Sequence, residues 1–116
     1  MEFAVSREGT TLITLHGGSD TTAREDATEQ LAAALERLEA EGTVSAWEID
    51  DASVYEQPTA PFDPYTITLE FSITVVVEAD DADEATANGA NAIDDVLEQA
   101  DVTPITYTTS PAASAD

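Results

Sequence analysis

The stretch His16-Gly17-Gly18-Ser19-Asp20 has the residue types and spacing that come nearest to a site of chemistry in this chain. Two glycines and a serine ahead of a helix start can present backbone amides to a phosphate or a carboxylate. The stretch has neither the Walker spacing nor the GxGxxG spacing, and no basic residue lies within it. Two interpretations stay open. One is an anion site at Gly17, Gly18 and Ser19. The other is a glycine turn followed by a Ser or Asp helix cap, and the pattern favours this second interpretation.

The chain is poorly supplied with groups for acid–base and nucleophilic catalysis. It has one histidine, no cysteine and no lysine, and these residues supply most general bases and nucleophiles. His16, Ser19 and Asp20 stand too close in sequence to form a nucleophile–base–acid relay by themselves. We therefore predict no catalytic residues and a protein that is not an enzyme.

A group of acidic residues could suggest a divalent metal. It consists of Glu78, Asp80, Asp81, Asp83 and Glu84. A calcium loop of the EF-hand kind needs alternating oxygen ligands, a central glycine and a closing glutamate, and this pattern is absent. We predict a solvated acidic surface, with no metal site and no cofactor.

Charge is the strongest signal in the composition. The formal net charge is −22, from 25 acidic residues against three arginines, Arg7, Arg24 and Arg37. Nucleic-acid binding is disfavoured, because it needs cationic groups that displace counterions from phosphates. Local ion pairs at i,i+4 are expected instead, from Arg24 to Asp20 and from Arg37 to Glu41.

The same charge would strain a compact fold in dilute buffer through self-repulsion. At about 1 M salt the screening length shrinks to ~3 Å and most of that repulsion is removed. In composition the chain resembles proteins of salt-in halophilic archaea and of their viruses. The resemblance implies the cytoplasm of such a cell, or a virion, as the location.

Length and apolar runs predict one soluble domain. The chain has 116 residues, which suits a single domain. Its apolar runs, such as Val75-Val76-Val77, are far below the ~20 residues of a spanning helix, so no membrane association is expected. We place the domain at residues 1–109 and a flexible C-terminal tail at 110–116.

Periodicity in the first half predicts strand, helix, strand. Residues 3–15 are expected to form a hairpin that turns near Arg7-Glu8-Gly9. A capping box at Thr22–Glu25 is expected to begin a helix that Gly42 ends. In the strand 44–55 the apolar residues change parity at Asp50-Asp51, which predicts a β-bulge there.

The second half repeats this order. A Pro-rich loop over 57–64 precedes a strand of near-perfect alternation over 65–78. Asp81 is the expected cap of a second helix, in which Gly89 marks a close approach to the sheet. A last strand is expected over 102–109.

The two halves align at an offset of 58 residues, as in Ala27 with Ala85 and Val44 with Val102. Two βαβ units in series resemble the ferredoxin-like fold. The predicted fold class is therefore α+β: a ferredoxin-like two-layer sandwich of two helices on one mostly antiparallel sheet, with an extra N-terminal strand or hairpin.

In element order, residues 22 onward also look like the small tail-terminator and tail-completion proteins of tailed viruses. That resemblance implies a non-catalytic interaction or assembly module, adapted to high salt, which binds copies of itself or other proteins at a head–tail or tail-end interface. The alternative is a regulatory domain of a halophilic archaeon that binds a small ligand, with its anion site at the Gly17-Gly18 turn.

Overall fold

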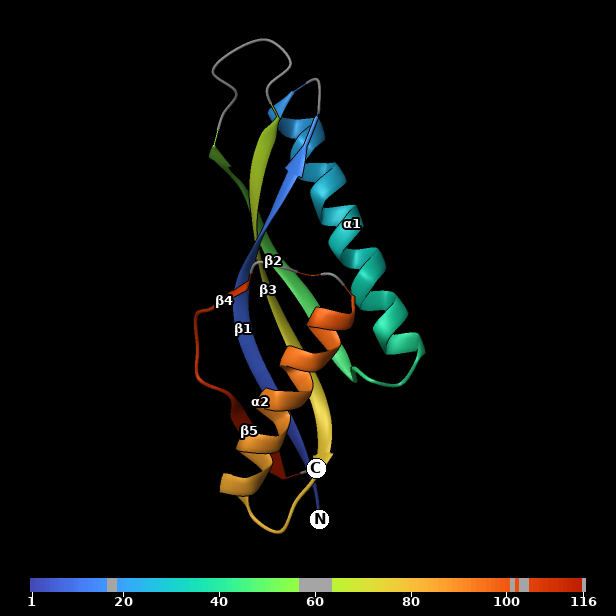
Figure 1. Ribbon diagram of the computed structural model, residues 1–116, viewed down its shortest axis with the longest axis vertical. Coiled ribbons are helices and arrows are strands. Elements are labelled where there is room, and N and C mark those ends of the chain that lie inside the picture. Colours follow the sequence, from blue (N-terminus) through green and yellow to red (C-terminus); the bar gives the residue numbers. More distant parts are fainter. Residues whose placement is uncertain (17–18, 57–63, 101, 103–104, 116) are drawn as a thin grey trace.

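The chain forms an α+β structure in which two helices cover one face of a five-stranded antiparallel sheet (Figure 1). The computed structural model describes residues 1–16, 19–56, 64–100, 102 and 105–115. The elements in chain order are β1 (Glu2–Leu15), α1 (Asp20–Ala40), β2 (Ala46–Glu56), β3 (Tyr65–Glu78), α2 (Ala82–Gln99), β4 (Ile105–Tyr107) and β5 (Ala112–Ala115).

Strand β1 lies inside the sheet. The strand order is β2-β3-β1-β4, and β5 also pairs with β1. Along its whole length β1 is antiparallel to β3, from Glu2 opposite Glu78 to Leu15 opposite Tyr65. The two chain ends therefore lie side by side, with Phe3 opposite Ala115.

The predicted N-terminal hairpin is wrong, because β1 is one continuous strand of 14 residues. The glycine that suggested a turn has a different role. A Cβ on Gly9 would stand 3.1 Å from the backbone oxygen of Thr106 and 3.4 Å from a ring carbon of Tyr107. Gly9 is buried in mid-strand, and its missing side chain lets β4 pack closely against β1.

Helix α1 begins three residues before the predicted capping box. Ser19 is its N-cap, and the Ser19 hydroxyl accepts a hydrogen bond from the Thr22 amide at 3.2 Å. Gly42 ends the helix as predicted, with a positive φ of 84°. The Gly42 amide donates to the Glu39 carbonyl and the Thr43 amide to the Leu38 carbonyl, the two bonds of a Schellman motif.

The predicted bulge in β2 is confirmed. Ile49 pairs with Phe71 and Asp51 pairs with Glu70, so Asp50 is the extra residue. The bulge brings Ala52 and Val54 to the same face of the sheet as Trp47 and Ile49. A second irregularity between Val54 and Glu56 was not predicted; the residue between them, Tyr55, is 66% exposed.

The core lies between the helices and the odd-numbered side chains of β3, whose predicted alternation is confirmed. Ile67, Leu69, Phe71, Ile73 and Val75 are each at most 1% exposed. Helix α1 contacts mainly β2 and β3, whereas α2 contacts β3, β1 and β5. The buried stripe of α1 is Ala23, Ala27, Leu31, Leu35 and Leu38, and that of α2 is Ala85, Gly89, Ile93, Val96 and Leu97.

Helix α2 approaches the sheet most closely at Gly89. Asp81 caps this helix as predicted, since its carboxylate accepts from the Glu84 amide at 2.8 Å. A Cβ on Gly89 would lie 2.4 Å from both Cβ and Cγ1 of Val5. The predicted close approach of helix and sheet is confirmed, and Val5 is the residue that requires it.

Gly89→Ala is therefore expected to lower the free energy of unfolding by a net value of about 2 kcal/mol. The clash involves the Cβ of Val5, which cannot rotate away, and its cost exceeds the gain in helix propensity of alanine over glycine. Urea unfolding at fixed salt measures the effect. Asn88→Ala, at the exposed neighbouring position, is the control and is expected to stabilise slightly. Equal stability of the Gly89→Ala variant and the parent would contradict this packing.

The C-terminal region departs from the predicted strand and tail. Strand β4 is confined to Ile105–Tyr107, and residues 101, 103 and 104 lie outside the described residues. Where a flexible tail was predicted, Ala112–Ala115 forms β5, which pairs with Phe3–Ser6. Backbone pairing with β1 holds this segment, although its small side chains give no strand pattern in the sequence.

Candidate functional site

The structure uses Ser19 as a helix cap. Its hydroxyl also lies 3.1 Å from the hydroxyl of Thr22, so the Ser19 side chain is occupied within its own turn. Gly17 and Gly18 lie outside the described residues, and the anion site predicted at Gly17, Gly18 and Ser19 stays a prediction. His16 is exposed at the end of β1.

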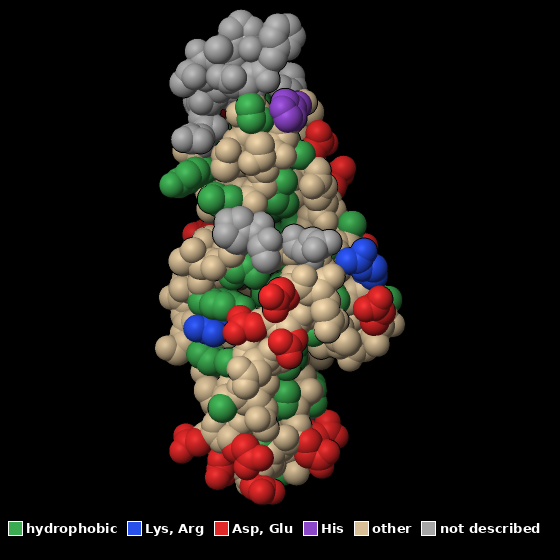
Figure 2. Space-filling model, in the orientation of Figure 1, with side chains coloured by type: hydrophobic (Ala, Val, Ile, Leu, Met, Phe, Trp, Pro, Cys, Tyr) green, Lys and Arg blue, Asp and Glu red, His purple; other side chains and the backbone are tan. Residues whose placement is uncertain are grey.

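The acidic residues before α2 do not converge on a metal position. Asp81 is engaged as the N-cap, and Glu78 pairs with the amino group of Met1 at 3.8 Å. Within the described part of the chain, no group of three or more His, Cys, Asp or Glu side chains could hold a metal ion. Figure 2 shows carboxylates gathered at the end of the molecule where α2 begins.

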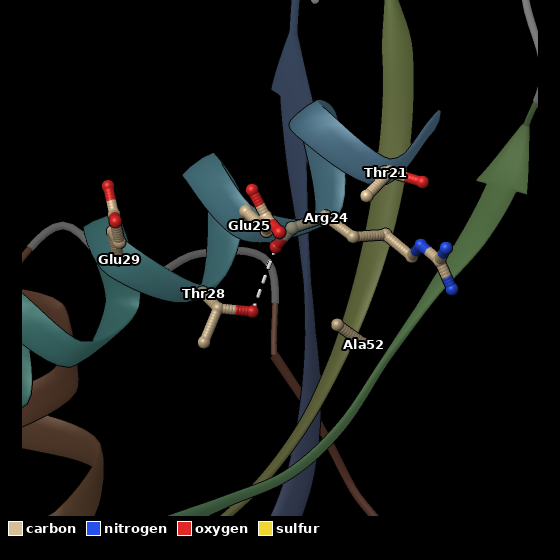
Figure 3. Close-up of a pocket in the computed structure, with 6 residues that line it drawn as sticks. All are labelled: Thr21, Arg24, Glu25, Thr28, Glu29 and Ala52. Atoms are coloured by element: carbon tan, nitrogen blue, oxygen red, sulfur yellow. Dashed lines mark hydrogen bonds between the residues drawn. The ribbon is translucent and has the colours of Figure 1, made fainter. Parts of the chain in front are cut away.

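A groove of about 480 Å³ lies between the first half of α1 and strand β2. Its volume falls within the range of small-molecule sites. Helical spacing aligns five of its lining residues on α1, and β2 contributes one (Figure 3). They are Thr21, Arg24, Glu25, Thr28, Glu29 and Ala52.

Arg24 is the cationic side chain among these lining residues. Figure 3 shows the side chain reaching from α1 past Ala52 toward β2. Its Nε atom is buried and has no hydrogen-bond partner. A buried donor without a partner is costly and rare in folded proteins, so this atom calls for an explanation.

The predicted ion pairs of Arg24 with Asp20 and of Arg37 with Glu41 do not form. Over the described ranges, the ion pair of Met1 with Glu78 is the one present. The Asp20 carboxylate accepts instead from the Thr21 amide at 2.9 Å. Arg24 is thereby left directed into the groove.

The bulge in β2 leaves room for this groove. The bulge at Asp50 turns the small side chain of Ala52 toward α1, where Asp51 would otherwise face. The Thr28 hydroxyl donates to the Arg24 carbonyl at 2.8 Å, so it is already engaged. Among the described residues, the resulting groove is lined by hydroxyl, carboxylate and guanidinium side chains around Ala52.

A second polar group joins α2 to strands β1 and β4. The Tyr107 hydroxyl donates to the Asp94 carboxylate, and the Arg7 guanidinium lies 3.8 Å from the centroid of the Tyr107 ring. The Nε of Arg7 donates to the Thr109 carbonyl at 3.0 Å. These contacts fix the short strand β4 against the helix layer.

Burial raises the pKa of Tyr107 above its ordinary value of 10.0. The hydrogen bond to Asp94 and the negative charge of Asp94 raise this pKa further, whereas the positive charge of Arg7 lowers it. The folded state therefore favours the protonated phenol. The stability that results is fully present below pH 10.0 and is lost as the pH rises from there toward the folded-state pKa.

Tyr107→Phe is expected to reduce that alkaline loss of stability. The variant also lacks the hydrogen bond to Asp94, which is expected to cost about 1 kcal/mol at neutral pH. Urea unfolding of parent and variant between neutral pH and pH 11 or so measures both effects. Tyr55→Phe, at an exposed position, is the control. A parallel pH dependence in the parent and the Tyr107→Phe variant would contradict this assignment.

The sheet face opposite the helices, here called the open face, is formed by the even-numbered residues of β1 and β3 and their neighbours on β2. Serine, threonine and carboxylate side chains make up most of it, and the Ser6 and Thr74 hydroxyls hydrogen-bond across β1 and β3 at 2.8 Å. Leu12 is half-buried, and Val76 is 41% exposed. This face carries no helix in the described structure.

A band of exposed carboxylates crosses the open face at mid-height. Asp51 lies directly opposite Glu70, while Glu48 and Glu8 flank Ser72 from the two sides. Like charges directly opposite each other on a sheet are destabilising. We refer to these four residues as the carboxylate band.

Sequence reasoning missed both the groove and the Tyr107–Asp94 contact. A signal for the groove was present, because Thr21, Arg24 and Thr28 follow one another at helical spacing beside the buried stripe. The pairing of Asp94 with Tyr107 depends on how α2 lies over β4, and no local pattern encodes it.

Within the described residues, neither helix is long and apolar enough to cross a membrane. Comparison of the chain with models of known protein families, with curated protein sequences and with solved structures finds no match.

Proposed function

We propose that the protein is a non-catalytic interaction module that works in concentrated salt and associates with copies of itself or with other proteins through the open face. The observation that carries the proposal is a sheet that, in the described structure, has helices on one face, while the other face presents hydroxyl side chains, the carboxylate band, and the apolar side chains of Leu12 and Val76. An uncovered sheet face can pack against a partner without a cavity.

The carboxylate band makes self-association depend on salt. Two copies facing each other would bring these acids together, and screening at about 1 M salt reduces that repulsion strongly. The free edge of β2 is a weaker candidate surface. Bulges and acidic residues at Asp50 and Asp51 interrupt it, and such features oppose the addition of a further strand.

The proposal includes a ferredoxin-like topology. The strand order β2-β3-β1-β4, with a helix after β1 and after β3, supports it. So do the equivalent positions at an offset of 58 residues, such as Leu35 with Ile93 and Val44 with Val102, which are buried in both halves. A role as a head–tail or tail-end component of a virion, and a location in a virion or in a salt-in cytoplasm, remain proposals that rest on composition and element order.

Light scattering after size-exclusion chromatography tests the proposal. In salt at about 1 M or above we expect a dimer or ring that dissociates as the salt is lowered. Val76→Glu, on the open face, is expected to give a monomer. Ala33→Glu, on the exposed side of α1, adds the same charge and should leave the oligomer intact. A strict monomer at high protein concentration in high salt contradicts the proposal, and an oligomer unaffected by Val76→Glu contradicts the choice of face.

The second candidate function is a regulatory domain that binds a small ligand. The specific observation in its favour is the side chain of Arg24, which lines the groove between α1 and β2 and makes no ion pair with a described residue. In sequence, the first residue lining the groove is Thr21, two residues after Ser19. A thermal-shift screen of metabolites in high salt tests this function, and a flat response across the panel would end it.

A further inference from the structure

The groove between α1 and β2 presents charges of both signs from different directions. Figure 3 shows the Arg24 guanidinium extended toward β2, whereas the side chains of Glu25 and Glu29 leave α1 in another direction. Both glutamates are exposed and stand about one helical turn apart. A molecule lying in the groove therefore meets a cation on the β2 side and carboxylates on the α1 side.

Arg24 determines one end of the ligand. A guanidinium matches the planar geometry of a carboxylate with two parallel hydrogen bonds, and Figure 3 shows the terminal nitrogens of Arg24 extended away from α1 beyond Ala52. The side chain passes over Ala52, whose small size leaves the space beside the guanidinium open. A carboxylate is the group that best satisfies this arrangement.

The rest of the molecule determines the net charge of the ligand. In molar salt only charges close to the ligand act on it strongly, and the carboxylates of Glu25 and Glu29 line the groove itself, where they repel a free anion. A zwitterion carries no net charge, and its ammonium group is attracted to the same two glutamates. The ligand that fits is therefore neutral overall but charged at both ends.

We propose that the groove binds a small zwitterion whose carboxylate and ammonium groups are separated by several bonds, as in an ω-amino acid. The carboxylate contacts Arg24, and the ammonium group lies toward Glu25 and Glu29. This inference rests on the second proposed function and names its ligand class.

Backbone amide NMR shifts, followed in KCl at about 1 M, test the proposal with a set of matched probes. The probes are γ-aminobutyrate and ε-aminocaproate as long zwitterions, glycine as a short one, and butyrate and butylammonium with one charge each. The long zwitterions are expected to shift the amides of Thr21, Thr28 and Ala52 and to bind about fivefold more tightly than either singly charged probe.

Variants of the chain assign the two ends. Arg24→Gln is expected to abolish binding of all the carboxylate probes. Arg24→Lys is expected to keep part of that binding, because lysine retains the positive charge but cannot form the two parallel hydrogen bonds of a guanidinium. Glu25→Gln is expected to weaken the binding of zwitterions and to leave the affinity for butyrate unchanged or slightly higher. Arg37→Gln, on the same helix outside the groove lining, is the control and should bind like the parent.

Four outcomes would overturn the proposal. Equal affinity for butyrate and γ-aminobutyrate would mean a simple anion site, and tighter binding of glycine would mean that the charges are recognised close together. An absence of shifts with every probe would mean that the groove takes no ligand of this class. A metabolite found by thermal shift that is not a zwitterion would leave the second function standing and refute this inference alone.

Discussion

Replacing Phe71 with alanine is expected to lower the free energy of unfolding by about 3–5 kcal/mol. Phe71 is 1% exposed and is the largest of the fully buried side chains. It lies at the centre of β3, opposite Gly9 on β1 and Ile49 on β2. The truncation leaves a cavity that neighbours on the sheet can fill only by moving their strands, so most of the cost is retained. Urea unfolding at constant KCl measures it.

The neighbouring position supplies a matched control. Ser72 follows Phe71 in the same strand but lies on the open face. Ser72→Ala is expected to change stability by less than about 0.5 kcal/mol, as for a surface substitution. A small effect at Phe71 together with a large one at Ser72 would mean that the face assigned to the core is the wrong one.

Lowering the salt concentration is expected to unfold the protein, with loss of structure below about 0.5–1 M. The formal charge of −22 lies on a chain of 116 residues. The structure locates one source of the repulsion in the carboxylate band, where Asp51 and Glu70 are direct cross-strand neighbours. Such neighbours have Cβ atoms about 5 Å apart, which is shorter than the screening length of about 10 Å at 0.1 M salt and longer than that of ~3 Å at 1 M. Circular dichroism along a KCl dilution series measures the transition, and a native spectrum in dilute buffer contradicts the expectation.

Neutralising one member of the opposed pair is expected to move that transition to lower salt. Asp51→Asn or Glu70→Gln removes a repulsion of up to about 1 kcal/mol in dilute buffer and has little effect in molar salt. Glu36→Gln removes the same charge from α1, where the nearest like charge along the helix face is Glu39 at i+3 and such a pair costs at most about 0.5 kcal/mol. A smaller shift is expected there. Equal shifts for the three variants would mean that total charge alone, and not its placement, sets the salt requirement.

Several elements could be predicted because a single local pattern determines each of them. The alternation of β3 places its odd-numbered residues in the core, and the change of parity in β2 requires an extra residue at Asp50. A glycine within an otherwise regular helix pattern indicated that something approaches closely at Gly89, although only the fold identifies Val5 as the neighbour.

Other elements depend on tertiary contacts that local patterns do not contain. Gly9 has the same appearance in the sequence whether it makes a turn or admits a neighbouring strand, and the prediction chose the turn. Strand β5 has the composition of a tail, and it is a strand because the edge of β1 beside it accepts its hydrogen bonds. The i,i+4 rule assigned Arg24 to Asp20, but the first turn of α1 uses that carboxylate for a backbone amide.

The position of β1 within the sheet has a consequence for how the chain folds during synthesis. This strand leaves the ribosome before its partners do, because Phe3 pairs with Val77 and Ala115. Pairings so distant in sequence carry a high entropic cost of loop closure and slow the search for the native state. Until β3 and β5 have been synthesised and have paired with it, β1 is a long unpaired strand that is prone to aggregate. The acidic charge that strains the folded sheet also makes such nascent chains repel one another.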